Sequence, residues 1–266
     1  MVGMFKHLTQ IRYLEEEMRR REWLANLGEM SAGMAHEIRN PLGALAGAMQ
    51  MLRQDVGPDE TSQRLMDIAI REAKRLDNII TEFLQYARPP ALNLSEHDLN
   101  KVLADTLDLI QHEARSRNGI TIIPKMASGT LTAQVDPDQL KQVFWNLATN
   151  AFDAMVGGGT LTIATGLRRV EVGGRRTHVI EIGFQDSGEG IPRQNFDKIF
   201  LPFFTTKKEG SGLGLAQVHR MVELHGGWVK VESGVGAGAR FIVCLPQSAE
   251  TGVRLWHEGR EAWKRF

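Results

Sequence analysis

A regular spacing of apolar and small residues is the strongest constraint on how the first part of this chain folds. Between Leu27 and Leu52 these residues recur at alternating steps of three and four, which is the pattern of a coiled-coil seam on an α-helix. The seam comprises Leu27, Ser31, Met34, Ile38, Pro41, Leu45, Ala48 and Leu52. It predicts a helix with one packing face and an opposite face that holds His36 in water.

A proline lies inside this first helix. We expect one continuous helix over residues 5–53, in which Pro41 removes an amide donor and clashes with the carbonyl of Glu37. The sequence therefore predicts a kink at Pro41. The kink is either tolerated local strain or a bending point that presents His36 in one state and withdraws it in another.

A second amphipathic helix follows a turn marked by Gly57 and Pro58. This helix runs to about Ala87, and its apolar residues again form a single stripe: Ala69, Ala73, Leu76, Ile80, Phe83 and Ala87. Two antiparallel helices with one stripe each cannot bury both stripes alone. We therefore expect an antiparallel helical hairpin that forms a four-helix bundle as a homodimer.

Composition and charge exclude several classes of protein. The 266 residues suffice for two modest domains. Lys plus Arg and Asp plus Glu each number 32, so no global basic field indicates a nucleic-acid partner. No run reaches the roughly 18 apolar residues that span a bilayer. The single cysteine, Cys244, is typical of a reducing compartment, and we expect a cytoplasmic protein.

The residue pattern changes after Pro90. From residue 96 to residue 246, helices and strands in turn predict an α/β sandwich, a mixed sheet with helices on one face. We expect helices near 99–116, 137–156 and 213–225, strands near 120–124, 130–135, 160–168 and 177–186, and a hairpin over 228–245. Ser95 to Asp98 reads as a helix-capping signal. The expected domains are a coiled-coil-like helix (1–23), the helical hairpin (24–89), the α/β domain (96–246) and a tail of open role (247–266).

Four short boxes in the α/β part indicate a nucleotide pocket. WNLATNA places Asn146 and Asn150 four apart on one helix face, where amide oxygens suit a hard ion such as magnesium. DSGEGIP places Asp186 beside glycines after a strand, where a carboxylate can accept a hydrogen bond from the amino group of adenine. FLPFFTTK and GSGLGLA supply lysine and glycines before a helix start, whose amides attract phosphate. Taken singly, each box also has an ordinary structural explanation as a surface pair, a turn or a solvated loop.

In this order, and together with His36, the boxes resemble those of the sensor histidine kinases over about Leu24 to Pro246. The resemblance implies a Bergerat-type ATP-binding fold and protein-histidine kinase activity. It implies that His36 attacks the γ-phosphate of ATP, while Glu37 holds the ring tautomer and accepts its proton. The phosphoryl group then passes to an aspartate in the receiver domain of a response regulator. Kinases of this family usually carry a sensor, so the resemblance implies membrane contact only through a sensor part that this chain does not include. Asn40 resembles the residue that orients water when such kinases dephosphorylate their regulator.

The resemblance also assigns nucleotide contacts. Asn150 corresponds to the magnesium ligand, Asn146 to a supporting residue, and Asp186 to the residue that reads adenine. The other residues of the implied ATP site are Gly188, Gly190, Lys207, Gly210, Gly212 and Gly214. Many relatives carry small hydroxyl residues where this chain has Ala239 and Arg240, so we assign no base contact there.

Two other functions stay open at this point. An ATPase module of the chaperone, gyrase and mismatch-repair kind shares the asparagine and glycine boxes, but it needs no exposed histidine ahead of the domain. A non-catalytic dimeric scaffold would bind nucleotide only to report a state. The signal, the regulator, and whether a subunit phosphorylates itself or its neighbour do not follow from the sequence.

Overall fold

The computed structural model describes residues 38–40, 42–52, 60–87, 91–117, 119–172, 175–207 and 210–247. The chain divides into two compact units, an N-terminal unit (Met1–Pro90) and a C-terminal unit (Ala91–Phe266). The predictions for His36, Glu37 and the kink at Pro41 lie outside the described residues, and so does nearly all of the predicted tail.

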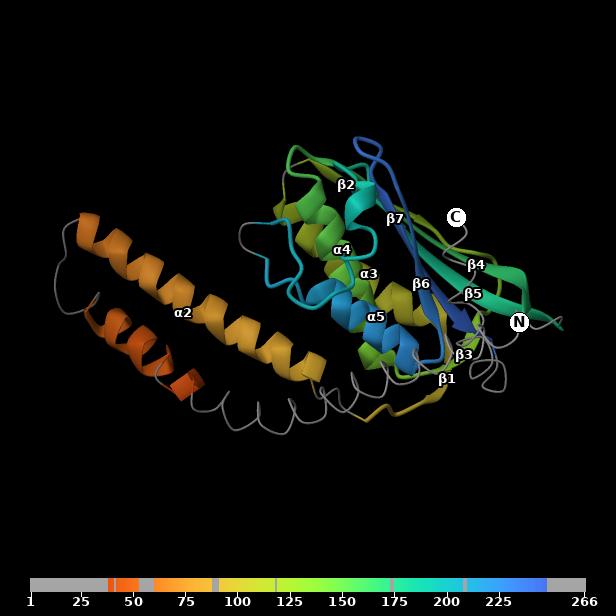
Figure 1. Ribbon diagram of the computed structural model, residues 1–266, viewed down its shortest axis with the longest axis horizontal. Coiled ribbons are helices and arrows are strands. Elements are labelled where there is room, and N and C mark those ends of the chain that lie inside the picture. Colours follow the sequence, from red (N-terminus) through yellow and green to blue (C-terminus); the bar gives the residue numbers. More distant parts are fainter. Residues whose placement is uncertain are drawn as a thin grey trace, which may run out of the picture. The chain divides into compact units, whose positions relative to one another are not determined.

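The N-terminal unit contains a helical hairpin. Residues 38–40 and 42–52 are helical, and α2 spans Glu60–Ala87 (Figure 1). Arg39, near the start of the described part of the first helix, donates through Nε to Asp77 Oδ1 and through Nη2 to Thr81 Oγ1, at 2.9 Å for the latter. Since both acceptors lie in the second half of α2, the two helices run antiparallel, as predicted.

Large apolar side chains remain exposed on both helices of this hairpin. They are Ile38, Leu45, Met51 and Leu52 on the first helix and Leu65, Ile68 and Leu76 on α2. Scattered apolar residues are normal on a protein surface, but these recur along a helix pair that cannot cover them by itself. Among the helices of the described segments, none is both long and apolar enough to cross a membrane.

The C-terminal unit is built on a mixed five-stranded sheet with the order β2-β4-β5-β7-β6. Only β2 and β4 pair in parallel, and the other neighbours are antiparallel. The strands are β2 (Ile120–Lys125), β4 (Gly159–Val172), β5 (Arg175–Gln185), β6 (Trp228–Ser233) and β7 (Ala239–Pro246). A separate antiparallel pair joins β1 (Ser95–Asp98) to β3 (Thr132–Val135).

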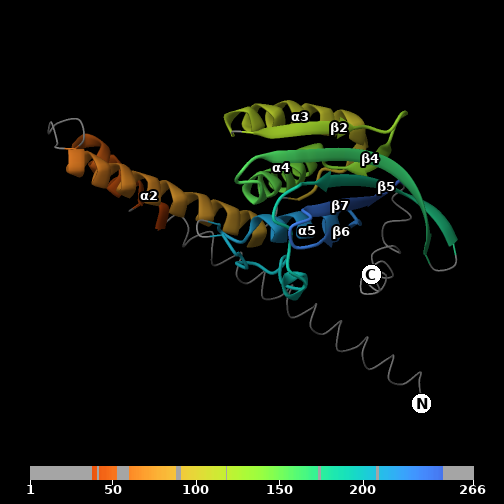
Figure 2. The same cartoon turned by 90° about the horizontal axis from the view of Figure 1, so that it is seen from above.

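Three helices cover one face of the sheet, α3 (Leu99–Ser116), α4 (Pro137–Ala154) and α5 (Gly214–Leu224), as Figures 1 and 2 show. Alternate residues of the strands point into the core between sheet and helices, as the period of two in a strand requires. Phe144 of α4 and Phe184 of β5 are fully buried there, with ring centroids 5.9 Å apart. The predicted mixed sheet with helices on one face is confirmed.

The predicted capping signal over Ser95 to Asp98 is confirmed at Asp98 and wrong at Ser95. Residues Ser95 to Asp98 form β1, which pairs with β3, and the cap of α3 is Asp98, whose Oδ1 accepts from the backbone N–H of Asn100 at 3.1 Å. The same oxygen accepts from the N–H of Leu131 at 3.3 Å. Pairing with β3 extends the backbone as far as Asp98, so the helix can begin only after it.

Replacing Asp98 with Ala removes an N-cap and a tie to the loop before β3. We expect Asp98→Ala to lower the free energy of unfolding by about 1–2 kcal/mol. Ser95→Ala, the matched control, should change it by less than about 0.5 kcal/mol because Ser95 is exposed and caps no helix. Urea denaturation of the full chain measures both. Equal losses for the two variants would contradict the assignment of the cap.

Candidate functional site

Helix α4 is fixed at its start by a buried aspartate. Asp136 accepts hydrogen bonds from the backbone N–H groups of Asp138, Gln139 and Asn93 at 3.1, 3.2 and 2.9 Å. Burial alone would raise the pKa of Asp136, but these donors outweigh it and hold the pKa below its usual value. The backbone N–H of Asp136 in turn donates to Nε2 of the buried His225, at 3.0 Å. The first turn of α4 is therefore tied to α5 and to the chain before β1.

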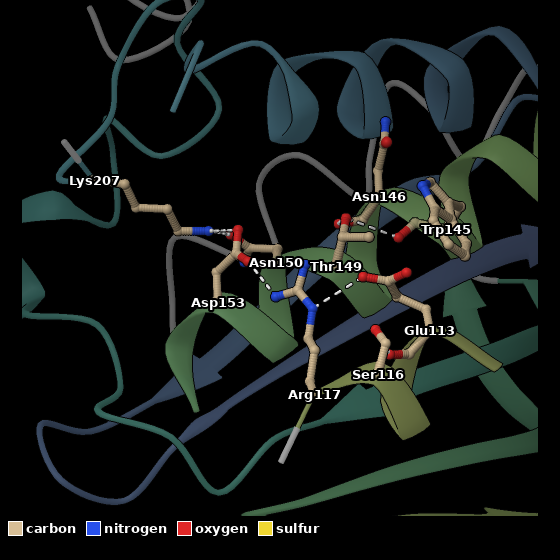
Figure 3. Close-up of polar contacts among 9 residues, drawn as sticks. All are labelled: Glu113, Ser116, Arg117, Trp145, Asn146, Thr149, Asn150, Asp153 and Lys207. Carbon is tan, nitrogen blue, oxygen red and sulfur yellow. Dashed lines mark hydrogen bonds and ion pairs between the residues drawn. The ribbon is translucent and has the colours of Figure 1, made fainter. Parts of the chain in front are cut away.

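The rest of α4 has two faces. Phe144, Leu147 and Ala151 are buried in the core, whereas Asn146 and Asn150 are partly exposed on the other face. Asn146 Nδ2 donates to Oε1 of Gln217, a buried residue of α5, at 3.2 Å. Asn146 thus joins α4 to α5. The amide of Asn150, one turn later, points toward Lys207 (Figure 3).

Asn150 belongs to a group of polar and charged side chains that contact one another in turn. We name this group the Asp153 cluster; it consists of Glu113, Arg117, Asn150, Asp153 and Lys207. Lys207 Nζ donates to Asn150 Oδ1 at 2.9 Å and to Asp153 Oδ2 at 3.0 Å. Arg117 Nη1 donates to Asp153 Oδ1 at 2.7 Å, and Arg117 Nε donates to Glu113 Oε1 at 3.0 Å (Figure 3). Burial favours a higher pKa for Asp153, but Arg117 and Lys207 together hold that pKa below its usual value.

Asp186 follows β5 directly and is buried, with 4% of its surface exposed. Its Oδ1 accepts from the backbone N–H groups of Gly188 at 2.8 Å and Ala239 at 3.1 Å. Burial raises the pKa of Asp186, while these two donors and the more distant Lys207 ammonium act against the rise. The carboxylate is therefore held in one orientation by the main chain.

The loop after Asp186 depends on a close backbone approach. Gly190 has φ +74°, and a Cβ at this position would lie 2.0 Å from the carbonyl oxygen of Gly234, in the turn between β6 and β7. Gly236 in the same turn donates its N–H to the carbonyl of Glu189 at 2.7 Å. A side chain at Gly190 would push the loop off the turn and would displace the residues that follow Asp186.

The second glycine loop leads into α5. Gly212 has φ +70°, and a Cβ there would lie 2.5 Å from the carbonyl carbon of Phe203, whose N–H donates to the carbonyl of Gly212 at 3.0 Å. Gly210 lies against Thr205, and Gly214 is the first residue of α5. No side chain in the described segments caps α5. Its first amides can therefore bind an anion.

Within the C-terminal unit, the structure brings together some of the predicted ATP-site residues. Lys207 contacts Asn150, and Gly188 contacts Asp186, whereas Asn40 is an exposed helix residue of the N-terminal unit. No group of three or more His, Cys, Asp or Glu side chains in the described residues forms a metal-binding cluster. A magnesium site there would consist of a few protein oxygens and the phosphates of a nucleotide, as is usual for this ion.

Sequence reasoning missed several of these contacts. Asp153 stands three residues after Asn150, so helical spacing was a signal that it shares the face of Asn150. Gln217 gave no such signal because its partner Asn146 is 71 residues away. The N–H of Ala239 contacts Asp186 through the backbone, which no residue type reveals.

Two protein families match the chain. Residues 26–92 match the family described as His Kinase A (phospho-acceptor) domain. Residues 135–249 match the family described as Histidine kinase-, DNA gyrase B-, and HSP90-like ATPase. The second match contains both asparagines of α4, Asp186, Lys207 and the glycine loops.

Individual proteins are similar over most of the chain. The sensor histidine kinase ZraS of Escherichia coli (strain K12) is 38% identical over 242 residues, which are 91% of this chain and 50% of ZraS. The chain thus spans about half the length of this relative. The crystal structure of histidine kinase ThkA in complex with response regulator protein TrrA is 31% identical, with a TM-score of 0.63, over 91% of this chain and 68% of that one. Full-length ShkA in complex with AMPPNP has a TM-score of 0.66 at 25% identity, over 82% of this chain and 45% of that one.

Replacing Gly190 with Ala tests the close approach at the Asp186 loop. Gly236→Ala is the matched control, because Gly236 has φ +76° but open space around its Cβ position. We expect the control to cost about 1–2 kcal/mol for the left-handed backbone, and Gly190→Ala to cost at least about 1 kcal/mol more because the backbone must also shift. Thermal unfolding measures both, and equal melting temperatures would contradict the predicted clash.

Proposed function

Because this chain belongs to the sensor histidine kinases, we propose that it is an ATP-dependent protein-histidine kinase that phosphorylates its own His36 and passes the phosphoryl group to an aspartate of a response regulator. The observation that carries the proposal is a buried Asp186 held by the main chain of the C-terminal unit. Lys207, whose ammonium acts electrostatically on Asp186, donates to the amide oxygen of Asn150 and so links the two residues. The match of residues 26–92 to a phospho-acceptor domain supplies the second half of the reaction.

Asp186 binds the adenine ring in this proposal. Two backbone N–H groups already hold its Oδ1, so the carboxylate cannot rotate away from a base, and a carboxylate oxygen accepts well from an exocyclic amino group. Gly188 and Gly190 let the loop after Asp186 pack closely against Ala154 and the turn between β6 and β7, and this holds the loop in place beside the base. Gly210, Gly212 and Gly214 turn amides toward the phosphates at the start of α5, and the ammonium of Lys207 adds positive charge nearby.

The oxygens beside α4 suit magnesium. Asn150 Oδ1 and Asp153 Oδ2 both accept a hydrogen bond from the ammonium of Lys207. These two atoms therefore already bind a cationic group, and oxygen atoms are the ligands that magnesium prefers. We assign Asn150 as the magnesium ligand and Asn146 as its support. When bound, the ion neutralises charge on the phosphates.

His36 is the phosphate acceptor. At neutral pH much of an unperturbed imidazole is uncharged, so a ring nitrogen can attack the γ-phosphorus. The nitrogen–phosphorus bond forms as the bond to the bridging oxygen breaks, and ADP leaves. Glu37 holds the other ring nitrogen and accepts the proton. We place this reaction in the cytoplasm, where ATP is available.

The helical hairpin supports a homodimer and a docking surface for the regulator. Its exposed apolar residues, such as Leu45, Leu65 and Leu76, need a second hairpin to cover them, which a four-helix bundle provides. ThkA is described in complex with a response regulator, and a receiver domain is the partner that we propose for this chain.

An ATPase of the gyrase and HSP90 kind is the rival function. The match over residues 135–249 fits both. The match over residues 26–92 and the helical hairpin favour the kinase, since such an ATPase needs no phospho-acceptor helix.

Incubation with γ-labelled ATP and magnesium separates the possible functions. We expect the chain to acquire label that survives base and is lost in acid, as a phosphohistidine requires, and we expect His36→Gln to reduce the label to background. Release of free phosphate without labelled protein would support the ATPase instead. Neither label nor free phosphate would support a scaffold that only binds nucleotide.

Asn40→Ala tests the proposed water-orienting role. Asn40 is exposed, so the substitution should leave the fold and the labelling of His36 unchanged. We expect dephosphorylation of a receiver domain that accepts label from this chain to slow by about tenfold or more, since an ill-oriented water reacts slowly. An unchanged rate of dephosphorylation would refute the role.

A further inference from the structure

The ammonium of Lys207 lies between two oxygens that come from one face of α4. Its Nζ is 2.9 Å from Asn150 Oδ1 and 3.0 Å from Asp153 Oδ2. Asn150 and Asp153 are three apart, so successive turns of the helix direct both side chains to the same side. The pair of oxygens therefore converges on one cation, and that cation belongs to the protein itself.

The other oxygen of Asp153 is held independently of Lys207. Arg117 Nη1 donates to Asp153 Oδ1 at 2.7 Å, and Glu113 holds the same guanidinium from α3 at 3.0 Å. The guanidinium also lies 5.5 Å from the ring centroid of Phe152. Arg117 thus has three contacts, and its bond to Asp153 Oδ1 does not involve Lys207 (Figure 3).

The Lys207 contact is a weak one. The side chains of Lys207 and Asp153 are 38% and 41% exposed, and ion pairs this exposed contribute little to stability. A lysine is also a flexible point charge on a long stem. The ammonium can therefore leave the oxygen pair at low cost once another cation takes its position.

We infer that Asp153 is a positioning residue that shares a cation position with Asn150: the position holds Lys207 before nucleotide binds and holds magnesium with ATP, and Lys207 is then released toward the phosphates. The inference rests on the proposed function, because it assumes that the pocket binds ATP. It adds a carboxylate to the single asparagine assigned as the magnesium ligand. Asp153 holds the ion or one of its waters, and Arg117 keeps the carboxylate in place during the exchange.

If this exchange occurs, removing Asp153 and removing the ammonium of Lys207 change the magnesium dependence of nucleotide affinity in opposite directions. Without Asp153, magnesium loses an anionic partner, and a nucleotide without metal no longer meets a negative charge. The dependence of nucleotide affinity on magnesium must therefore fall. Without the ammonium of Lys207, Asp153 keeps Arg117 on its other oxygen but loses the positive charge on Oδ2. A metal ion must then supply that charge against the phosphates, and the dependence on magnesium must rise.

Calorimetric titration of the full chain with AMPPNP tests this, once with magnesium and once with a chelator. The measured quantity is the dissociation constant with the chelator divided by the dissociation constant with magnesium. A larger ratio means that binding depends more strongly on magnesium. We expect Asp153→Asn to lower the ratio about tenfold, in line with the loss of a charged hydrogen-bonding partner. We expect Lys207→Gln to raise it. Glu113→Gln is the control, because it changes the charge around Arg117 without touching Lys207, and its ratio should stay within about twofold of the parent.

Each outcome decides the inference. A ratio for Asp153→Asn equal to that of the parent, or a ratio that Glu113→Gln lowers equally, assigns Asp153 a structural role alone and overturns the inference. A ratio for Lys207→Gln that fails to rise overturns the exchange. A parent chain that binds no AMPPNP in either condition overturns the proposed function as well, so the two failures are distinguishable. Circular dichroism of each variant verifies that the fold is intact.

Discussion

The packing of α4 against the five-stranded sheet is the interaction on which the rest of the candidate site depends. Phe144 and Leu147 bury one face of the helix completely, and this fixes its rotation. The same rotation turns Asn150 and Asp153 away from the core, so the free energy of apolar burial also positions polar groups that contribute little to stability. Asp136 fixes the helix along its axis, because its cap defines the residue at which α4 begins.

Main-chain groups orient Asp186 and hold the loop that follows it. Asp186 is oriented by the N–H groups of Gly188 and Ala239 rather than by side chains, and the close contact of Gly190 with the turn between β6 and β7 keeps that loop in place. Charged side chains gather instead at the Asp153 cluster, where they are partly exposed and can exchange partners. The ATP site that we propose thus combines a rigid region for the base with a partly exposed, charged region for phosphate and metal.

Local patterns predicted most elements well. The helices expected over 99–116 and up to Ala87 have those limits in the structure, because apolar spacing and breaking residues act within a few positions of one another. The capping signal was right at Asp98 and wrong at Ser95, because Ser95 belongs to β1, which pairs with the distant strand β3. The β4–β5 hairpin also exceeds its predicted length, since the two strands continue to pair with each other as far as Val172 and Arg175.

The amino-acid sequence alone determined the class of fold, the order of its elements and the residues that carry the boxes, since spacing along the chain encodes each of these. Tertiary structure alone decided the long-range contacts of the candidate site. The bond from Asn146 to Gln217, the N–H of Ala239 on Asp186 and the position of Lys207 between Asn150 and Asp153 join segments 50 or more residues apart. The reason is that hydrogen bonds act over about 3 Å in space, and only the packing of α4, α5 and the sheet brings these groups within that distance.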